Sequence, residues 1–217
     1  MRISFLLAVI GSATSFEAYA GTRAAKTSYK VDVEMTSQVN IPMGLLKDGE
    51  QAATMIFSGI GIQLTWADES QRARLSEAGL HSLATQEIAV EIIPHAPAGF
   101  SSIALAMALP RAVSGVRIAV FYDRVEPLLR GHHASQATIL GYVLAHEIGH
   151  VLQGVARHSD VGVMRARWLD NDFKQMSLGA LTFTNEDIQL IRHRFESASL
   201  LATCFGTCSM TPTERQN

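Results

Sequence analysis

Two histidines and a glutamate stand at a spacing that suits a bound metal ion. His146, Glu147 and His150 form the pattern His-Glu-x-x-His. On an α-helix each residue turns the chain by about 100°, so the two imidazoles lie on one face, one turn apart. Two neutral imidazoles so placed bind one zinc ion together, and the carboxylate next to them acts as a general base on water. The pattern therefore predicts a zinc site with hydrolytic chemistry.

A buried helix is predicted to carry these residues. Ser135 is a good N-cap and Gly154 suits a left-handed C-terminal stop, so the helix should span about 135–154. Apolar side chains recur along it at helical spacing: Ile139, Leu140, Val143, Leu144, Ile148, Val151 and Leu152. Small residues form a second stripe that lets another element approach closely: Gly141, Ala145 and Gly149. Because ionisable side chains on a buried helix need a partner, a metal ion is expected there.

A catalytic zinc site needs a third protein ligand and one position left open for water. His158 follows the predicted helix end by four residues, so the chain can turn back toward the metal, and we favour it as the third ligand. Asp160 is an alternative, because carboxylates also bind zinc. Glu186, on a later predicted helix, is a further alternative. The sequence leaves these three candidates open.

The other histidines and two tyrosines receive less specific interpretations. His132 and His133 lie in a loop that begins with glycine, and we expect them to be solvated. Three histidines have no partner at a useful spacing and are interpreted as structural: His81, His95 and His193. Tyr142 and Tyr122 are candidates to assist the reaction, with ordinary packing of their rings as the competing interpretation.

The segment from His146 to His158 resembles the metzincin group of zinc endopeptidases. Members of that group have H-E-x-x-H-x-x-G-x-x-H, in which the glycine lets the chain turn toward the third histidine. In this chain the two later spacers are each one residue longer, which gives H-E-x-x-H-x-x-x-G-x-x-x-H with Gly154 and His158. Residues 158–165 are also similar to small exported bacterial proteins of unknown role. The resemblance suggests that Met164 is the methionine of a metzincin Met-turn. Met164 follows the third histidine more closely in sequence than the corresponding methionine of that group does.

The resemblance implies a zincin-like fold and a peptidase activity. It implies a twisted mixed sheet with a buried active-site helix at about 29–154, and a small, mostly helical lower subdomain at about 155–217. Peptides or proteins would be hydrolysed by a zinc-activated water, with Glu147 as the general base. Two other functions remain open: a zinc hydrolase of cell-wall peptides or other amides, and a metal-binding interaction module without catalysis.

The order of the predicted elements is that of an α/β layer arrangement. Strands are predicted at 29–35, 62–66, 88–93 and 116–122, with an additional edge strand at 103–109. A helix is predicted at 42–57, and another should begin at about 184–187. Three segments have weaker patterns and are interpreted as follows: 68–83 as a short helix or loop, 123–134 as a polar connection, and 197–217 as a tail.

The N-terminus has the pattern of a secretory signal. Arg2 precedes an apolar run at 3–10, and Ala18-Tyr19-Ala20 is a small-x-small cleavage site. The apolar run is too short to span a bilayer. We therefore expect residues 1–20 to be removed, and residues 21–217 to form a single exported domain without a membrane span. A buried N-terminal strand is the competing interpretation.

Charge and cysteine content restrict the range of partners. The chain has 20 acidic and 18 basic residues, well mixed along the sequence, which argues against a nucleic-acid partner. Cys204 and Cys208 are the two cysteines, and their spacing allows either a small disulfide loop or free thiols. Nothing in the sequence indicates the oligomeric state.

Overall fold

The computed structural model describes residues 29–67, 86–99, 104–112, 115–132 and 134–206 of the 217-residue chain. Several sequence predictions concern residues outside these ranges and stay predictions: the secretory signal, segment 68–83, His81, His133 and Cys208. None of the described helices is both long and apolar enough to cross a membrane.

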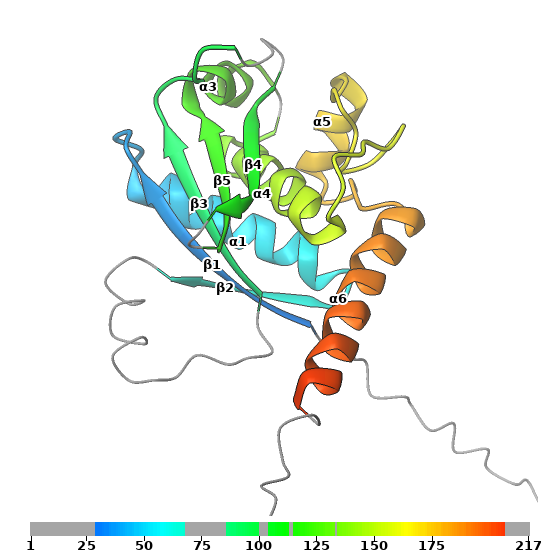
Figure 1. Cartoon of the computed structure of the whole chain (residues 1–217). Coiled ribbons are helices and arrows are strands. Elements are labelled where there is room, and N and C mark those ends of the chain that lie inside the picture. The colour runs from blue at the N-terminus through cyan, green and yellow to red at the C-terminus, as the bar shows by residue number, and fades with distance from the viewer. Residues whose placement is uncertain (1–28, 68–85, 100–103, 113–114, 133, 207–217) are drawn as a thin grey trace, which may run out of the picture.

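The described strands form one mixed sheet. They are β1 (Tyr29–Ser37), β2 (Ile62–Ala67), β3 (Gln86–Ile93), β4 (Ala106–Ala112) and β5 (Gly115–Phe121). Their order in the sheet is β2-β1-β3-β5-β4. Neighbouring strands are parallel except for β4, which pairs with β5 in the antiparallel sense at one edge (Figure 1). The mixed α/β fold class and the edge strand are thus confirmed.

The sheet is apolar on one face, because side chains on a strand alternate between its two faces. Buried aliphatic side chains occupy every second position of the three central strands: Val31, Val33 and Met35 on β1, Ile88, Val90 and Ile92 on β3, and Ile118 and Val120 on β5. Between them stand exposed charged residues such as Asp32, Glu87 and Arg117. Only one face therefore offers a surface on which helices can pack.

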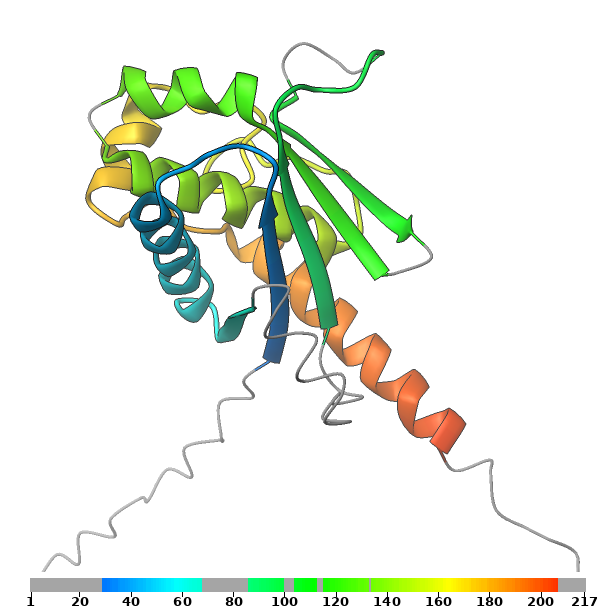
Figure 2. The same ribbon diagram turned by 90° about the vertical axis from the view of Figure 1, so that its left-hand side faces the viewer.

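Five helices are described: α1 (Met43–Ser58), α3 (Tyr122–Gly131), α4 (Gln136–Gln153), α5 (Asp170–Ser177) and α6 (Asn185–Gly206). Figure 2 shows α1 and α4 side by side on the same face of the sheet. α4 is buried along most of its length, including Ile139, Leu144 and Leu152. The two helices that follow α4 give the C-terminal third a mostly helical character, as expected, while its treatment as a separate subdomain stays a prediction.

α1 and α4 approach each other through glycines. A Cβ atom built on Gly141 would stand 2.4 Å from the Cβ of Ala52 and 2.9 Å from the carbonyl oxygen of Gly49. A Cβ atom on Gly49 would in turn meet the side chain of Leu140 at 2.9 Å. The small stripe predicted on the metal helix is thus confirmed as a close-contact surface, and it fixes how α4 is rotated against its neighbour.

Segment 123–134 was predicted to be a polar connection, and this prediction is wrong. Residues 122–131 form α3, in which Val125 and Leu129 are buried one turn apart. Asp123 in the first turn and Arg130 in the last turn complement the helix dipole. Pro127 lies within the helix and lowers its intrinsic helix propensity. The burial of one apolar face of the helix outweighs this cost.

Two further boundaries differ from the prediction. α6 continues to Gly206, so residues 197–206 are helical and do not belong to a patternless tail. β4 begins at Ala106 and runs to Ala112, three residues beyond the predicted end. It contains Pro110 and a register irregularity against β5, both of which an edge strand tolerates because one side of it has no ladder partner.

Candidate metal centre

α4 begins and ends at the residues that the sequence predicted. The hydroxyl of Ser135 accepts a hydrogen bond from the Thr138 N–H at 3.1 Å, which satisfies one of the free donors of the first turn. Gly154 adopts φ = 70°, a left-handed conformation that ends the helix and redirects the chain. The chain after Gly154 can therefore return along the side of α4 that carries the histidines.

His146 and His150 face each other from successive turns of α4. Their Nε2 atoms lie 3.1 Å apart. The other ring nitrogen of His146, Nδ1, is 2.8 Å from the carbonyl oxygen of Val163. Because a carbonyl only accepts, Nδ1 carries the proton, and Nε2 presents a lone pair to the space between the two rings.

The loop after Gly154 brings His158 to the same point. The ring centroid of His158 lies 5.3 Å from that of His146 and 4.9 Å from that of His150. One nitrogen from each of the three rings lies within 4.8 Å of the other two. Within the described ranges, this is the group of histidine, cysteine and carboxylate side chains that has metal-binding geometry.

The three imidazoles fit a zinc ion. Zinc binds histidine nitrogen at about 2.0–2.1 Å, so two nitrogens on a tetrahedral ion lie roughly 3.3 Å apart, close to the spacing of the Nε2 pair. Burial lowers the pKa of His146 to about 4, and it also lowers the pKa of His150. Both rings are therefore neutral at pH 7, which is the form that binds metal. Three imidazole nitrogens beside an open cavity match the ligand set of a catalytic zinc site.

His150 is placed to bind zinc through Nε2, but its other ring nitrogen, Nδ1, has no well-placed hydrogen-bond acceptor. Nδ1 of His150 is buried and makes no hydrogen bond to the described part of the chain. The backbone of Val155 is near enough to favour the charged form of the ring, but its geometry falls short of a hydrogen bond. The tautomer of His150 is thus less firmly fixed than that of His146.

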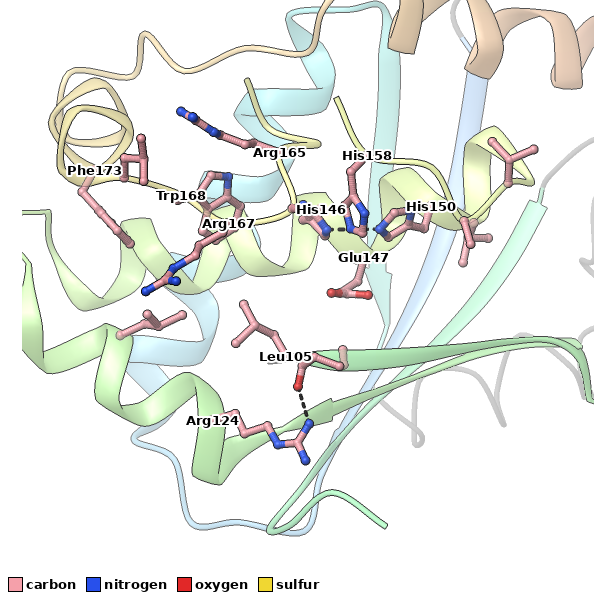
Figure 3. A pocket seen from close by; sticks show the side chains of 18 of the residues that line it. Leu105, Arg124, His146, Glu147, His150, His158, Arg165, Arg167, Trp168 and Phe173 are labelled. Atoms are coloured by element: carbon pink, nitrogen blue, oxygen red, sulfur yellow. Dashed lines mark hydrogen bonds between the residues drawn. The ribbon is translucent and has the colours of Figure 1, made fainter. Parts of the chain in front are cut away.

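Glu147 lies at the floor of the cavity, next to the imidazoles. The residue is 7% exposed, and Figure 3 shows its carboxylate turned toward the cavity on the side of Leu105. Burial raises the pKa of Glu147 to about 7. The carboxylate is thus close to the cavity space in front of His146 and His150, where a water molecule or substrate would lie.

The alternative third ligands lie away from the three imidazoles. Asp160 is exposed and is not a member of the group with metal-binding geometry. Glu186, at the start of α6, forms an ion pair with Arg157. Of the three candidates, the structure brings only His158 to the helix pair.

A buried carboxylate anchors the loop that carries His158. Asp187 on α6 has 0% exposure, and its Oδ1 accepts from the Ser159 hydroxyl at 2.7 Å and from Arg157 at 3.2 Å. The same oxygen accepts from Gln153 at the end of α4 at 3.2 Å. Its Oδ2 accepts from the N–H and the hydroxyl of Thr184. Asp187 therefore joins α4, the loop and α6 at one point.

The hydrogen bonds outweigh the effect of burial on Asp187. Burial alone would raise its pKa, but the donors from Thr184, Ser159 and Gln153 stabilise the charged form and hold its pKa below the ordinary value. Sequence reasoning treated Asp187 only as part of a helix start. Its partners on α4 and the loop are 28 to 34 residues away along the chain, so no local pattern reveals them.

Met164 packs under the metal helix. It is fully buried, and a Cβ atom built on Gly149 would meet its sulfur at 2.6 Å. The turn that contains it is held by hydrogen bonds from Ser159 N–H to the Met164 carbonyl at 2.8 Å and from Arg165 N–H to the Gly162 carbonyl at 3.2 Å. Its resemblance to a Met-turn remains an interpretation; its sulfur lies against Gly149, on the helix that carries His146 and His150.

A cavity of about 1350 Å³ opens in front of the three histidines. Trp168 lies on its wall with its ring edge-on to His146 at a centroid distance of 5.6 Å. His132 also lines the cavity and stacks on Phe173. His132 was predicted to be solvated; it is half-buried at the end of α3 and is not a member of the group with metal-binding geometry.

The two tyrosines lie elsewhere. The hydroxyl of Tyr142 is buried and donates to the carbonyl of Leu181 at 3.0 Å, and burial raises its pKa. Tyr122 begins α3, and neither tyrosine lines the cavity. His95 and His193 are exposed, and His95 lies 3.4 Å from a carboxylate oxygen of Asp123. The packing interpretation of the tyrosines agrees with these positions.

No protein-family model matches the sequence, and no relative is found among the curated proteins. Solved structures show a distant similarity. Metalloproteinase-II from Bacteroides fragilis is 13% identical with a TM-score of 0.45, over 77% of this chain and 54% of that chain. This chain thus spans about half the length of that protein.

Two archaeal proteins match over most of their own length. Archaemetzincin from Methanopyrus kandleri is 13% identical with a TM-score of 0.45, over 81% of this chain and 99% of that chain. A zinc-dependent peptidase from Methanocorpusculum labreanum is 12% identical with a TM-score of 0.45, over 73% of this chain and 99% of that chain. At these values the likeness is one of general architecture only.

Proposed function

We propose that this protein is a zinc-dependent endopeptidase. The observation that carries the proposal is the buried carboxylate of Glu147 beside three converging imidazoles at the floor of an open cavity. A structural zinc ion is enclosed by four protein ligands, whereas three ligands and an open side belong to catalysis. His146, His150 and His158 would hold the ion.

A bound zinc ion would supply a Lewis acid that lowers the pKa of a water molecule toward neutrality and polarises the carbonyl under attack. Glu147 accepts the proton of the attacking water and passes it to the leaving amine. A carboxylate with a pKa near 7 changes its protonation state readily at neutral pH, which suits both transfers. The hydrogen bond from His146 to Val163 keeps the first imidazole oriented during the reaction.

We also propose that the protein acts after export, which rests on the signal-like pattern of residues 1–20. The substrate would then be a peptide or protein outside the cytoplasm. A hydrolase of cell-wall peptides would use the same residues, because the walls of the cavity, and not the metal ligands, decide which amide enters.

The test combines metal content with hydrolysis of a mixed peptide library. The purified protein should contain zinc and cleave peptides, and a chelator should stop cleavage until zinc is restored. Glu147→Gln should keep its zinc but lose roughly 10²- to 10⁴-fold in kcat. Glu196→Gln, a change at an exposed glutamate of α6, serves as the matched control and should cleave normally.

Three outcomes would each count against a different part of the proposal. Normal cleavage by Glu147→Gln would remove the general base. A protein that binds no zinc would remove the metal centre. Zinc binding without cleavage of any peptide or cell-wall fragment would favour a metal-binding interaction module.

A further inference from the structure

The cavity lining carries an excess of positive charge. Four arginines line it: Arg124, Arg165, Arg167 and Arg194. The acidic side chains among the lining residues are Glu147 and Asp170. The chain as a whole has a formal net charge of −2, so the charge of the cavity is opposite in sign to that of the protein. A concave site of one sign concentrates ligands of the other.

Two of these arginines are held in place by the protein itself. Arg165 donates to Asp172 Oδ2 at 3.0 Å, and this carboxylate also accepts from the Leu169 N–H at 2.8 Å. Arg124 on α3 donates to the carbonyl of Ala104 at 2.7 Å. Both side chains therefore support the walls, and their hydrogen-bonding groups are partly used.

Arg167 differs from them. It is exposed, it lines the cavity, and it makes no hydrogen bond or ion pair within the described part of the chain. It immediately precedes Trp168, whose ring contacts His146. Figure 3 shows Arg167 on the same wall as Trp168 and Phe173, on the side of the cavity away from His150. The guanidinium of Arg167 is therefore available for a ligand, and the next residue in the sequence, Trp168, contacts the metal-binding His146.

Arg194 is less suited to this part. Its guanidinium lies against Gly154, where a Cβ atom would meet Nη1 at 2.4 Å. It lines the cavity from α6. The contact with Gly154 uses its side chain to cover the end of α4.

We propose that Arg167 binds a carboxylate of the substrate, so that the enzyme prefers peptides with an acidic residue near the bond that is cleaved. A guanidinium binds a carboxylate through two parallel hydrogen bonds, which fixes the position of the ligand as well as its charge. Trp168, Leu169 and Phe173 add apolar surface to the lining of the same cavity. This inference rests on the proposed peptidase function.

The first experiment compares peptides that differ by a single Glu or Gln at each position around the cleaved bond. At one position the natural enzyme should cleave the Glu peptide roughly tenfold more efficiently in kcat/KM than the Gln peptide. In Arg167→Gln that ratio should fall to about one. Arg167→Lys should keep part of the preference, because a single ammonium retains the charge without the paired geometry.

Arg192→Gln is the matched control. Arg192 is an exposed arginine of α6 that does not line the cavity, so its loss should leave the ratio unchanged. The preference should also weaken as salt is added, since the pair is near the protein surface.

A binding measurement separates this inference from the proposed function. Zinc-loaded Glu147→Gln, which should turn over very slowly, is titrated with the Glu and the Gln peptide by calorimetry, with and without the Arg167→Gln change. Tighter binding of the Glu peptide that depends on Arg167 supports the inference even if no peptide is cleaved, in which case only the proposed function fails. Equal binding of the two peptides, or equal cleavage of them, overturns the inference and leaves the peptidase function standing.

Discussion

The two histidines on α4 and the third histidine on the following loop reach the same cavity by different means. His146 and His150 are placed by helix geometry, since both belong to one helix whose ends are set by Ser135 and Gly154. His158 belongs to a loop whose course depends on Asp187, 29 positions further along the chain. The first pair is thus a local feature, and the third donor is a long-range one.

This difference indicates which of the three histidines can be displaced by changes elsewhere in the molecule. α4 is buried against the sheet and α1, so its histidines keep their mutual spacing as long as the core is formed. The loop is buried in the core at Val163 and Met164, but its first part, which carries His158, has no apolar side chain in the core, and Val155 and Val161 are exposed. Its hydrogen bonds to one carboxylate therefore decide whether His158 stays within reach of the helix pair.

The largest effect is expected from Asp187→Ala, which tests the loop side of the comparison. The change leaves the donors of Ser159, Gln153 and Thr184 without their acceptor in a buried place, and it should lower the free energy of unfolding by about 3–5 kcal/mol. Zinc affinity should fall as well, because His158 is no longer held. Urea denaturation and a zinc titration measure the two effects.

Glu186→Ala is the matched control for this prediction. It removes the neighbouring carboxylate, which is exposed and pairs with the same Arg157, and it should cost no more than about 1 kcal/mol. If Asp187→Ala bound zinc as tightly as the natural protein, the loop would not depend on this carboxylate and the comparison would fail.

A smaller loss is expected from Gly141→Ala, which tests the helix side. The added methyl group has no space between Ala52 and the Gly49 carbonyl, so α1 and α4 must separate slightly, at a cost of about 1–3 kcal/mol. Gly44→Ala on α1 is the control. Its Cβ would meet nothing within 4 Å, so the helix should gain about 0.5–1 kcal/mol. Thermal unfolding of the two variants should shift in opposite directions.

The smallest expected effect is on the stability of the folded protein at acidic pH. The pKa of Asp187 is lowered in the folded state, so the unfolded chain takes up its proton first as the pH falls. The stability from this group is fully present above the unfolded pKa of about 3.9, and it is lost as the pH falls toward the folded pKa. The unfolding free energy of Asp187→Asn should therefore fall less steeply below about pH 4 than that of the natural protein.

Urea denaturation between pH 3 and pH 6 checks this pH dependence. Asp160→Asn, a change at an exposed carboxylate of the same loop, should follow the natural protein. Parallel curves for Asp187→Asn and the natural protein would show that the hydrogen bonds of Asp187 do not stabilise its charged form.

The elements with strong local signals were predictable from the sequence. α4 begins after Ser135 and ends before Gly154 because a capping hydroxyl and a glycine in the left-handed conformation act on their immediate neighbours. The central strands follow from alternating apolar residues, as in Val31, Val33 and Met35. The helix pair of histidines and its carboxylate follow from the same short-range geometry.

The rest depended on contacts between distant segments. α3 was missed because Pro127 lowers helix propensity, whereas the burial of Val125 and Leu129 that stabilises it depends on tertiary packing. The part played by Asp187 could not be predicted, since its partners come from α4 and the loop. Arg167 had no special spacing in the sequence, and only the shape of the cavity distinguishes it from other surface arginines.

The sulfur of Met164 lies so close to Gly149 that a Cβ atom built on that glycine would stand 2.6 Å from it. Oxidation to the sulfoxide would add a polar oxygen at a place that is fully buried and tightly packed. The folded protein should therefore resist peroxide there, and each oxidised molecule must first have opened beneath the histidine helix. The rate of Met164 oxidation would then report how often this region opens. Mass spectrometry of the peptide that contains Met164 would measure that rate.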